Sequence, residues 1–129
     1  MKHFVSLSDL SGQDIEKILA AAIKVKSARI RASQPLRGTS VALLFEKPSL
    51  RTRVTFEVAL TDLGAHPIYL GPNEIGLGKR ESVSDISRNL SRWIHGMVAR
   101  TFKHATAVEL ARTSSVPVIN ALTDREHPC

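Results

Sequence analysis

The chain has 129 residues, of which 43% are hydrophobic and 23% charged, and its formal net charge is +6 at pH 7. These proportions are typical of one globular domain. Basic residues are spread along the chain and aromatic residues make up 5% of it, which argues against a nucleic-acid partner. No run approaches the roughly 18 apolar residues of a membrane span and no secretion signal opens the chain, so we expect no membrane partner and a cytoplasmic location. The single cysteine, Cys129, excludes an intrachain disulfide.

The first expected element is a helix that begins near Ser11. Ser11 is a typical N-cap and Asp14 suits the first turn. Apolar residues then recur at helical spacing, at positions 15, 19, 22 and 23, which predicts a helix that continues to about Ser33, before Pro35 and Gly38. Its last turns carry four cations, which suit the negative end of the helix dipole: Lys24, Lys26, Arg29 and Arg31.

The rest of the chain alternates short apolar runs with helical segments. The runs predict strands at residues 41–45, 67–70, 97–99 and 116–119. The expected helices are one that follows Pro48 and Ser49 and ends at Leu63, one opened by Ser82 or Ser84 and continuing through Trp93, and one at residues 105–113. The segment 71–80 carries three glycines and a proline and is expected to be a loop.

Strands separated by helices imply right-handed crossovers and a parallel sheet. The expected fold class is therefore α/β, a doubly wound parallel sheet with helices on both faces, forming a single domain over residues 1–129. Ligands bind beyond the carboxyl ends of the strands in such sheets. Because polar segments follow Phe45, Leu70, Ala99 and Ile119, we expect the functional residues to converge on one edge of the sheet.

The segment from Glu46 to Arg53 joins a buried strand to a helix, which makes it suited to phosphate. Backbone N–H groups and the positive dipole end face outward at a helix start, where Ser49 and Thr52 add hydroxyls. Arg51 adds a bidentate fork for phosphate oxygens. Arg51 and Arg53 lie about 200° apart around a helix, so we expect Arg51 to be a ligand and Arg53 to form a structural ion pair. The alternative is a capped helix with two surface arginines.

Four motifs, in this order, resemble those of the aspartate and ornithine carbamoyltransferases. Residues 49–53 are similar to the family's Ser-Thr-Arg-Thr-Arg phosphate motif, and Phe45-Glu-Lys resembles its ornithine branch. Residues 78–82 are similar to the loop before the family's third helix. Residues 98–101 resemble the strand end whose arginine reaches the substrate, and residues 118–128 resemble the segment Asn-x-Leu-Thr-x-x-x-His-Pro.

The resemblance implies that residues 1–129 are the carbamoyl-phosphate-binding domain, with the second, amino-acid-binding domain absent from these residues. It implies two catalytic groups: Arg100, which bridges the phosphate and the carbonyl, and His127, which donates to the carbamoyl oxygen, where negative charge develops as an amine attacks. Without the resemblance, Arg100 would be expected as a surface or ion-paired arginine and His127 as a loop residue. The carbamoyl phosphate ligands implied by the resemblance are Ser49, Leu50, Arg51, Thr52, Arg100 and His127.

The resemblance also implies a reaction and an assembly. The carbamoyl group would pass to the side-chain amine of ornithine, giving citrulline and phosphate, in arginine biosynthesis or urea-cycle type metabolism. We expect no cofactor and no metal, a homotrimer in the full-length form, and no activity from this chain in isolation. The alternatives are a carbamoyltransferase for another amine and a non-catalytic phosphate-binding or assembly module.

Two positions depart from the family pattern. Leu50 stands where the motif usually has threonine, which removes one hydroxyl and leaves a backbone N–H. Gly76 stands near the place of a glutamine or histidine that reaches a neighbouring subunit, where Lys79 or Arg80 could supply charge instead. Cys129 has no nearby base apart from His127, and we expect no nucleophilic role for it.

Overall fold

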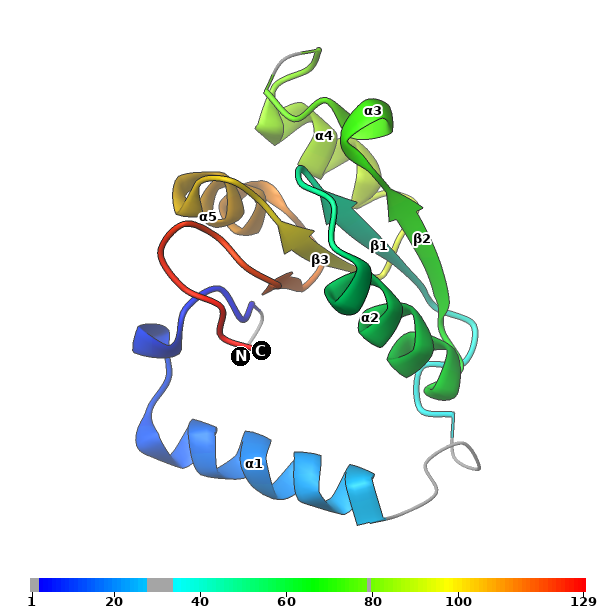
Figure 1. Cartoon of the computed structure of the whole chain (residues 1–129), viewed down its shortest axis with the longest axis vertical. Helices are drawn as coiled ribbons and strands as arrows, with labels where there is room; N and C mark the ends of the chain where they lie inside the picture. Colours follow the sequence, from blue (N-terminus) through cyan, green and yellow to red (C-terminus); the bar gives the residue numbers. More distant parts are fainter. Residues whose placement is uncertain (1–2, 28–33, 79) are drawn as a thin grey trace.

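A parallel sheet of four strands, in the order β2-β1-β3-β4, forms the centre of the molecule (Figure 1). The computed structural model describes residues 3–27, 34–78 and 80–129. The strands are β1 (Ser40–Phe45), β2 (His66–Leu70), β3 (Gly96–Arg100) and β4 (Val118–Asn120). The helices are α1 (Gly12–Ser27), α2 (Leu50–Asp62), α3 (Pro72–Ile75), α4 (Val83–Leu90) and α5 (His104–Thr113), preceded by a 3₁₀ turn, η1 (Leu7–Asp9).

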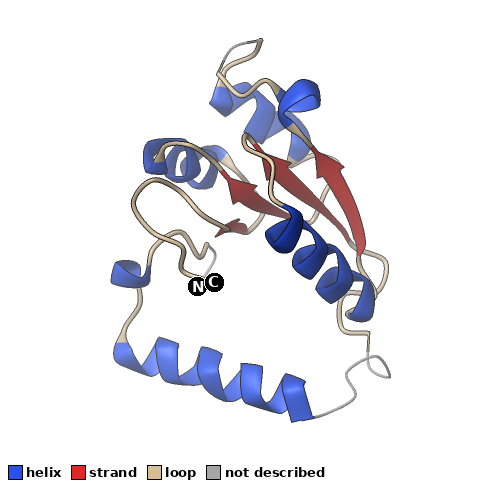
Figure 2. Cartoon of the chain, in the orientation of Figure 1, coloured by secondary structure: helices blue, strands red, loops and turns tan. Residues whose placement is uncertain are grey.

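Both faces of the sheet are covered by helices, as the apolar run of β1 predicts. Leu43 and Leu44 are fully buried although they point to opposite faces. Leu43 packs in a core cluster beneath α2, with Leu60, whereas Leu44 packs in a second cluster with residues of α3, α4 and α5. Figure 2 shows these helices distributed around the strands. The expectation of a doubly wound α/β fold is confirmed.

Helices α2 and α4 begin where the sequence places caps. The Ser49 side chain accepts a hydrogen bond from the N–H of Thr52, and the Ser82 side chain accepts one from the N–H of Asp85 at 3.1 Å. Each bond satisfies a donor that has no partner inside the helix. After α2, Gly64 takes a φ of 88°, a left-handed conformation that favours glycine and turns the chain toward β2.

The expected loop at residues 71–80 contains a short helix, α3, and this part of the prediction is wrong. Pro72 occupies its first turn, where a missing N–H costs nothing. The helix ends after one turn because Gly76 takes a left-handed φ of 47°. Arg80 is exposed, and Lys79 lies outside the residues that the structure describes.

Two element boundaries also differ from expectation. Helix α4 ends at Leu90, and the N–H of Trp93 donates to the carbonyl of Leu90, three residues back, so a tight turn leaves Trp93 69% exposed. Strand β4 begins at Val118 and not at residue 116. The hydroxyl of Ser114 hydrogen-bonds both the N–H and the carbonyl of Val116, which diverts that backbone from the sheet.

Helix α1 has the expected start, because the N–H of Asp14 donates to the hydroxyl of Ser11 at 3.2 Å. Its expected extension to Ser33, with Arg29 and Arg31, lies outside the described residues. Figure 1 shows α1 standing apart from the sheet, and its apolar residue Ile23 is 69% exposed. None of the helices in the described ranges is long and apolar enough to cross a membrane.

The N-terminal segment adds a pairing that the sequence does not predict. Phe4 forms an isolated parallel bridge with Ile119, so the chain start lies along the free edge of β4. Asn120, which is fully buried, secures this contact by donating from Nδ2 to the carbonyl of Val5 at 2.9 Å. Its Oδ1 accepts from the N–H of Leu122, also at 2.9 Å. One amide therefore joins the chain start to the segment after β4.

The variant Asn120→Asp tests this junction. Aspartate keeps the acceptor for Leu122 but loses the donor to Val5 and buries a carboxylate beside a carbonyl. We expect the free energy of unfolding in urea at pH 7 to fall by about 2–3 kcal/mol. The control, Asn89→Asp, makes the same change at an exposed site on α4 and should stay within about 0.5 kcal/mol of the unmodified chain. Equal losses in the two variants would contradict the assignment.

Candidate anion-binding site

The carboxyl edge of the sheet brings the start of α2 beside the end of β3. Strands β1 and β3 are neighbours, and Phe45 at the end of β1 is paired with Arg100 at the end of β3. Side chains alternate along a strand, so Arg100 shares its face with Val98, which packs in the core cluster beneath α2. The guanidinium of Arg100 is therefore directed toward α2. The expected convergence of residues on one edge is confirmed for these two segments.

The first turn of α2 offers backbone donors to a ligand. The N–H groups of Leu50 and Arg51 lie where a helix provides no internal acceptor, and the dipole places positive charge there. Leu50 itself is 78% exposed. The hydroxyl of Ser49 is engaged as the N-cap. The geometry suits an oxyanion.

Arg100 is held against this helix start by a side-chain contact. Its Nη1 donates to Oγ1 of Thr52 at 3.2 Å. Its Nε is buried and lacks a hydrogen-bond partner, which is found for no other buried side-chain nitrogen or oxygen in the described part of the chain. Buried donors are nearly always satisfied in folded proteins, so this Nε can take a further acceptor, such as an ordered water or a ligand oxygen.

The two arginines of α2 differ in their surroundings, as their spacing predicts. Nε of Arg53 lies 2.9 Å from Oε1 of Glu57, and its guanidinium carbon lies 3.6 Å from the centre of the Tyr69 ring. The hydrogen bond with Glu57 holds the pKa of Arg53 above its ordinary value. The structural ion pair is confirmed. Arg51 is exposed, with no hydrogen bond or ion pair found within the described ranges, and its role as a ligand stays a prediction.

The last segment carries His127, which is exposed and is not brought into contact with Arg100. Its Nδ1 lies 3.8 Å from the sulfur of Cys129, which in turn donates to the carbonyl of Asn120 at 3.0 Å. Desolvation raises the pKa of the Cys129 thiol, so the reactive thiolate is disfavoured at neutral pH. The catalytic role of His127 stays a prediction.

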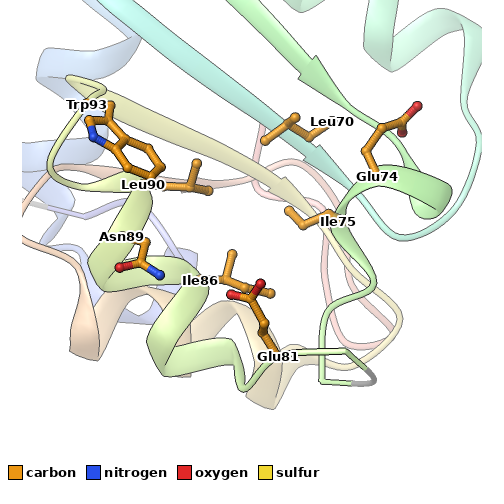
Figure 3. Close-up of a pocket in the computed structure, with 8 residues that line it drawn as sticks. All are labelled: Leu70, Glu74, Ile75, Glu81, Ile86, Asn89, Leu90 and Trp93. Atoms are coloured by element: carbon orange, nitrogen blue, oxygen red, sulfur yellow. The ribbon is translucent and has the colours of Figure 1, made fainter.

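A separate cavity of about 220 Å³ lies between β2, α3 and α4. Figure 3 shows the carboxylate of Glu81 beside Ile86 in this cavity, while that of Glu74 points away from the other residues. Trp93 closes one end. The lining is apolar and acidic, without a cation, so it does not suit a phosphate. Among the described residues, no group of three or more His, Cys, Asp or Glu side chains could hold a metal ion.

The sequence matches one protein family over nearly its whole length. The family model for the aspartate/ornithine carbamoyltransferase, carbamoyl-P binding domain, matches residues 2–129. The chain belongs to this family.

Relatives and solved structures agree with this assignment to the carbamoyltransferase family. The ornithine carbamoyltransferase of Archaeoglobus fulgidus is 47% identical over 131 residues, which cover 100% of this chain and 43% of the relative. The crystal structure of the Thermus thermophilus ornithine carbamoyltransferase is 44% identical, with a TM-score of 0.88, and covers 99% of this chain and 44% of that one. The crystal structure of the anabolic ornithine carbamoyltransferase from Campylobacter jejuni is 37% identical, with a TM-score of 0.91. The match covers 99% of this chain and 41% of that one. The chain thus spans under half the length of these carbamoyltransferases.

The carbamoyl-phosphate-binding domain contains one contact that sequence reasoning missed. The carboxylate of Glu46 accepts a hydrogen bond from the N–H of Phe102, beside Arg100. The signal was present in the sequence, since Glu46 directly follows a buried strand that ends at the expected site. The residues brought together are Ser49, Thr52 and Arg100, whereas Arg51 and His127 remain exposed.

The segment that carries His127 is tied to the chain start by its neighbour Glu126. Oε2 of Glu126 accepts from the N–H of Leu7 at 3.1 Å, and a hydrogen bond from Ser6 and this N–H lower the pKa of the carboxyl. A carboxyl whose pKa is lowered on folding stabilises the fold fully above its unfolded value of about 4.3. The stabilisation is lost as the pH falls through the lowered value.

We therefore expect Glu126→Gln to be less stable than the unmodified chain at pH 7, with the difference shrinking as the pH falls below about 4. Urea unfolding midpoints measured from pH 7 to pH 3 check this. Glu16→Gln, on the exposed surface of α1, is the control and should follow the unmodified chain. A difference for Glu126→Gln that is constant over the whole pH range would refute the linkage.

Proposed function

We propose that this chain supplies the carbamoyl-phosphate half of an ornithine carbamoyltransferase. The observation that carries the proposal is the buried, unpartnered Nε of Arg100. This arginine contacts Thr52 in the first turn of α2, where the N–H groups of Leu50 and Arg51 have no acceptor within the helix. A phosphate oxygen accepts from guanidinium and from backbone N–H alike, and a helix start adds favourable charge. Membership of the carbamoyltransferase family supports the same ligand.

In the proposed reaction, the side-chain amine of ornithine attacks the carbonyl carbon of carbamoyl phosphate. A C–N bond forms, the bond from that carbon to the phosphate oxygen breaks, and the amine proton is lost to phosphate or solvent, leaving citrulline and phosphate. Arg100 bridges the phosphate and the carbonyl oxygen, and His127 donates to the carbonyl oxygen, where each preorganised donor contributes about 3–4 kcal/mol to transition-state stabilisation. The phosphoryl group is held by Ser49, the N–H of Leu50, Arg51 and Thr52.

The finer assignments rest on the resemblance to ornithine carbamoyltransferases. They are ornithine as the acceptor, a place in arginine biosynthesis or urea-cycle type metabolism, a cytoplasmic location and a homotrimer for the whole protein. Residues 1–129 form one domain in this proposal, and a second domain holds the amino acid. Another amine acceptor is the alternative that leaves this site unchanged.

Calorimetric titration with carbamoyl phosphate tests the site. Each charge-assisted hydrogen bond contributes about 1.5–3 kcal/mol, so Arg51→Ala and Arg100→Ala should each weaken binding by about 10- to 100-fold. The control is Arg88→Ala, which removes an exposed arginine of α4 that pairs loosely with Asp85 at 3.8 Å. Its affinity should equal that of the unmodified chain. Equal binding heats from the unmodified chain and all three variants would refute the proposed site.

The same preparation separates binding from transfer. The chain covers 43% of the Archaeoglobus relative, so we expect the 129-residue polypeptide to bind carbamoyl phosphate but to form no measurable citrulline when ornithine is added. A colorimetric citrulline assay, with phosphate release followed in parallel, checks this. Citrulline formation at a rate proportional to the concentration of the chain would show that the ornithine site is contained within these residues.

A further inference from the structure

Glu46 contacts the end of β3 at two points, one at Arg100 and one two residues later at Phe102. Its backbone N–H donates to the carbonyl of Arg100 at 2.9 Å, and its carboxylate Oε2 accepts from the N–H of Phe102 at 2.8 Å. Phe45 and Arg100 are the last paired residues of β1 and β3. Beyond them the sheet supplies no backbone acceptor for Phe102, and the Glu46 side chain takes that place. Two hydrogen bonds from Glu46 therefore fix the backbone that carries the Arg100 side chain.

The position of this carboxylate is unfavourable for an anion site on electrostatic grounds alone. A negative charge near a bound phosphate opposes binding. The hydrogen bond to Phe102 gives a reason for its presence, because a bond of this kind makes a modest net contribution to stability and ties the exposed backbone at Phe102 to the end of β1. The other side of the segment is also held, since the N–H of Thr101 donates to the carbonyl of Leu122 at 3.0 Å.

We infer that Glu46 is a positioning residue for the anion site. Its carboxylate fixes residues 100–102 against the β1–α2 junction, and this keeps the guanidinium of Arg100 directed at Thr52 and the first turn of α2. This inference rests on the proposed function, in which Arg100 binds the phosphoryl group. Glu46 acts through Arg100 and need not touch the ligand.

Two substitutions separate positioning from charge. Glu46→Gln keeps an acceptor oxygen for Phe102 at the same reach and removes the negative charge, whereas Glu46→Ala removes both. In calorimetric titrations with carbamoyl phosphate, we expect Glu46→Ala to weaken binding by about 3- to 10-fold, the value of one hydrogen bond, and Glu46→Gln to restore it. Tighter binding by both variants would assign Glu46 a purely repulsive role and overturn the inference, as would equal weakening in both.

A double-mutant cycle tests whether the effect passes through Arg100. If Glu46 acts by placing that guanidinium, Glu46→Ala should add no further loss of affinity in an Arg100→Ala background. Independent, additive losses would overturn the inference. Glu16→Ala on α1 is the control for the loss of one carboxylate and should leave affinity unchanged. All titrations are run below the thermal unfolding midpoint of each variant, so that fold stability does not enter the comparison.

A measurement without ligand keeps this inference distinct from the proposed function. The ¹⁵Nε–¹Hε resonance of Arg100, assigned by its loss in Arg100→Lys, reports the surroundings of the buried Nε. We expect Glu46→Ala to shift it and Glu46→Gln to leave it in place. An unmoved resonance in Glu46→Ala would refute positioning. If the unmodified chain bound no carbamoyl phosphate, the proposed function would fail while this resonance still decided the role of Glu46.

Discussion

The register of β1 against β3 is the constraint on which the candidate site depends. Phe45 lies opposite Arg100, so the chain leaves both strands at one level and α2 begins beside the end of β3. A slip of one residue would turn Arg100 to the other face of the sheet, away from α2. Such a slip is opposed by the core, because the side chains of β1 are buried on both faces and β3 contributes to both core clusters.

Local contacts, more than the number of basic residues, determine which arginines can meet an anion. The chain has 18 lysines and arginines. Arg53 is occupied by Glu57 and the Tyr69 ring, which keep it along the side of α2. Arg100 is half-buried, where solvent screens its charge less than at the surface. Arg51 is exposed at the helix start, where it can meet a ligand without breaking a contact in the described structure.

The loops at the carboxyl edge are fixed by bonds from side chains to backbone as well as by backbone bonds between neighbouring segments. Glu46 holds the segment after β3, and Asn120 holds the segment after β4. Leu122 has a φ of 138°, which an L-residue rarely adopts, and it persists because its N–H is bonded to Asn120 and its carbonyl to the N–H of Thr101. Both anchoring side chains are polar residues directly at, or one position beyond, a strand end.

The sequence alone predicts the four strands in order, the helices α1, α2, α4 and α5, the capped start of α2 and the ion pair of Arg53, but not the short helix α3. These features depend on hydrophobic periodicity and on contacts within one helical turn, both of which are local. Three features depend on long-range contacts and could not be predicted: the pairing of Phe4 with Ile119, the partner of Glu46 and the burial of the Arg100 Nε. Glu46 and Phe102 are 56 positions apart, and such contacts follow from strand order and register, which a local pattern does not encode.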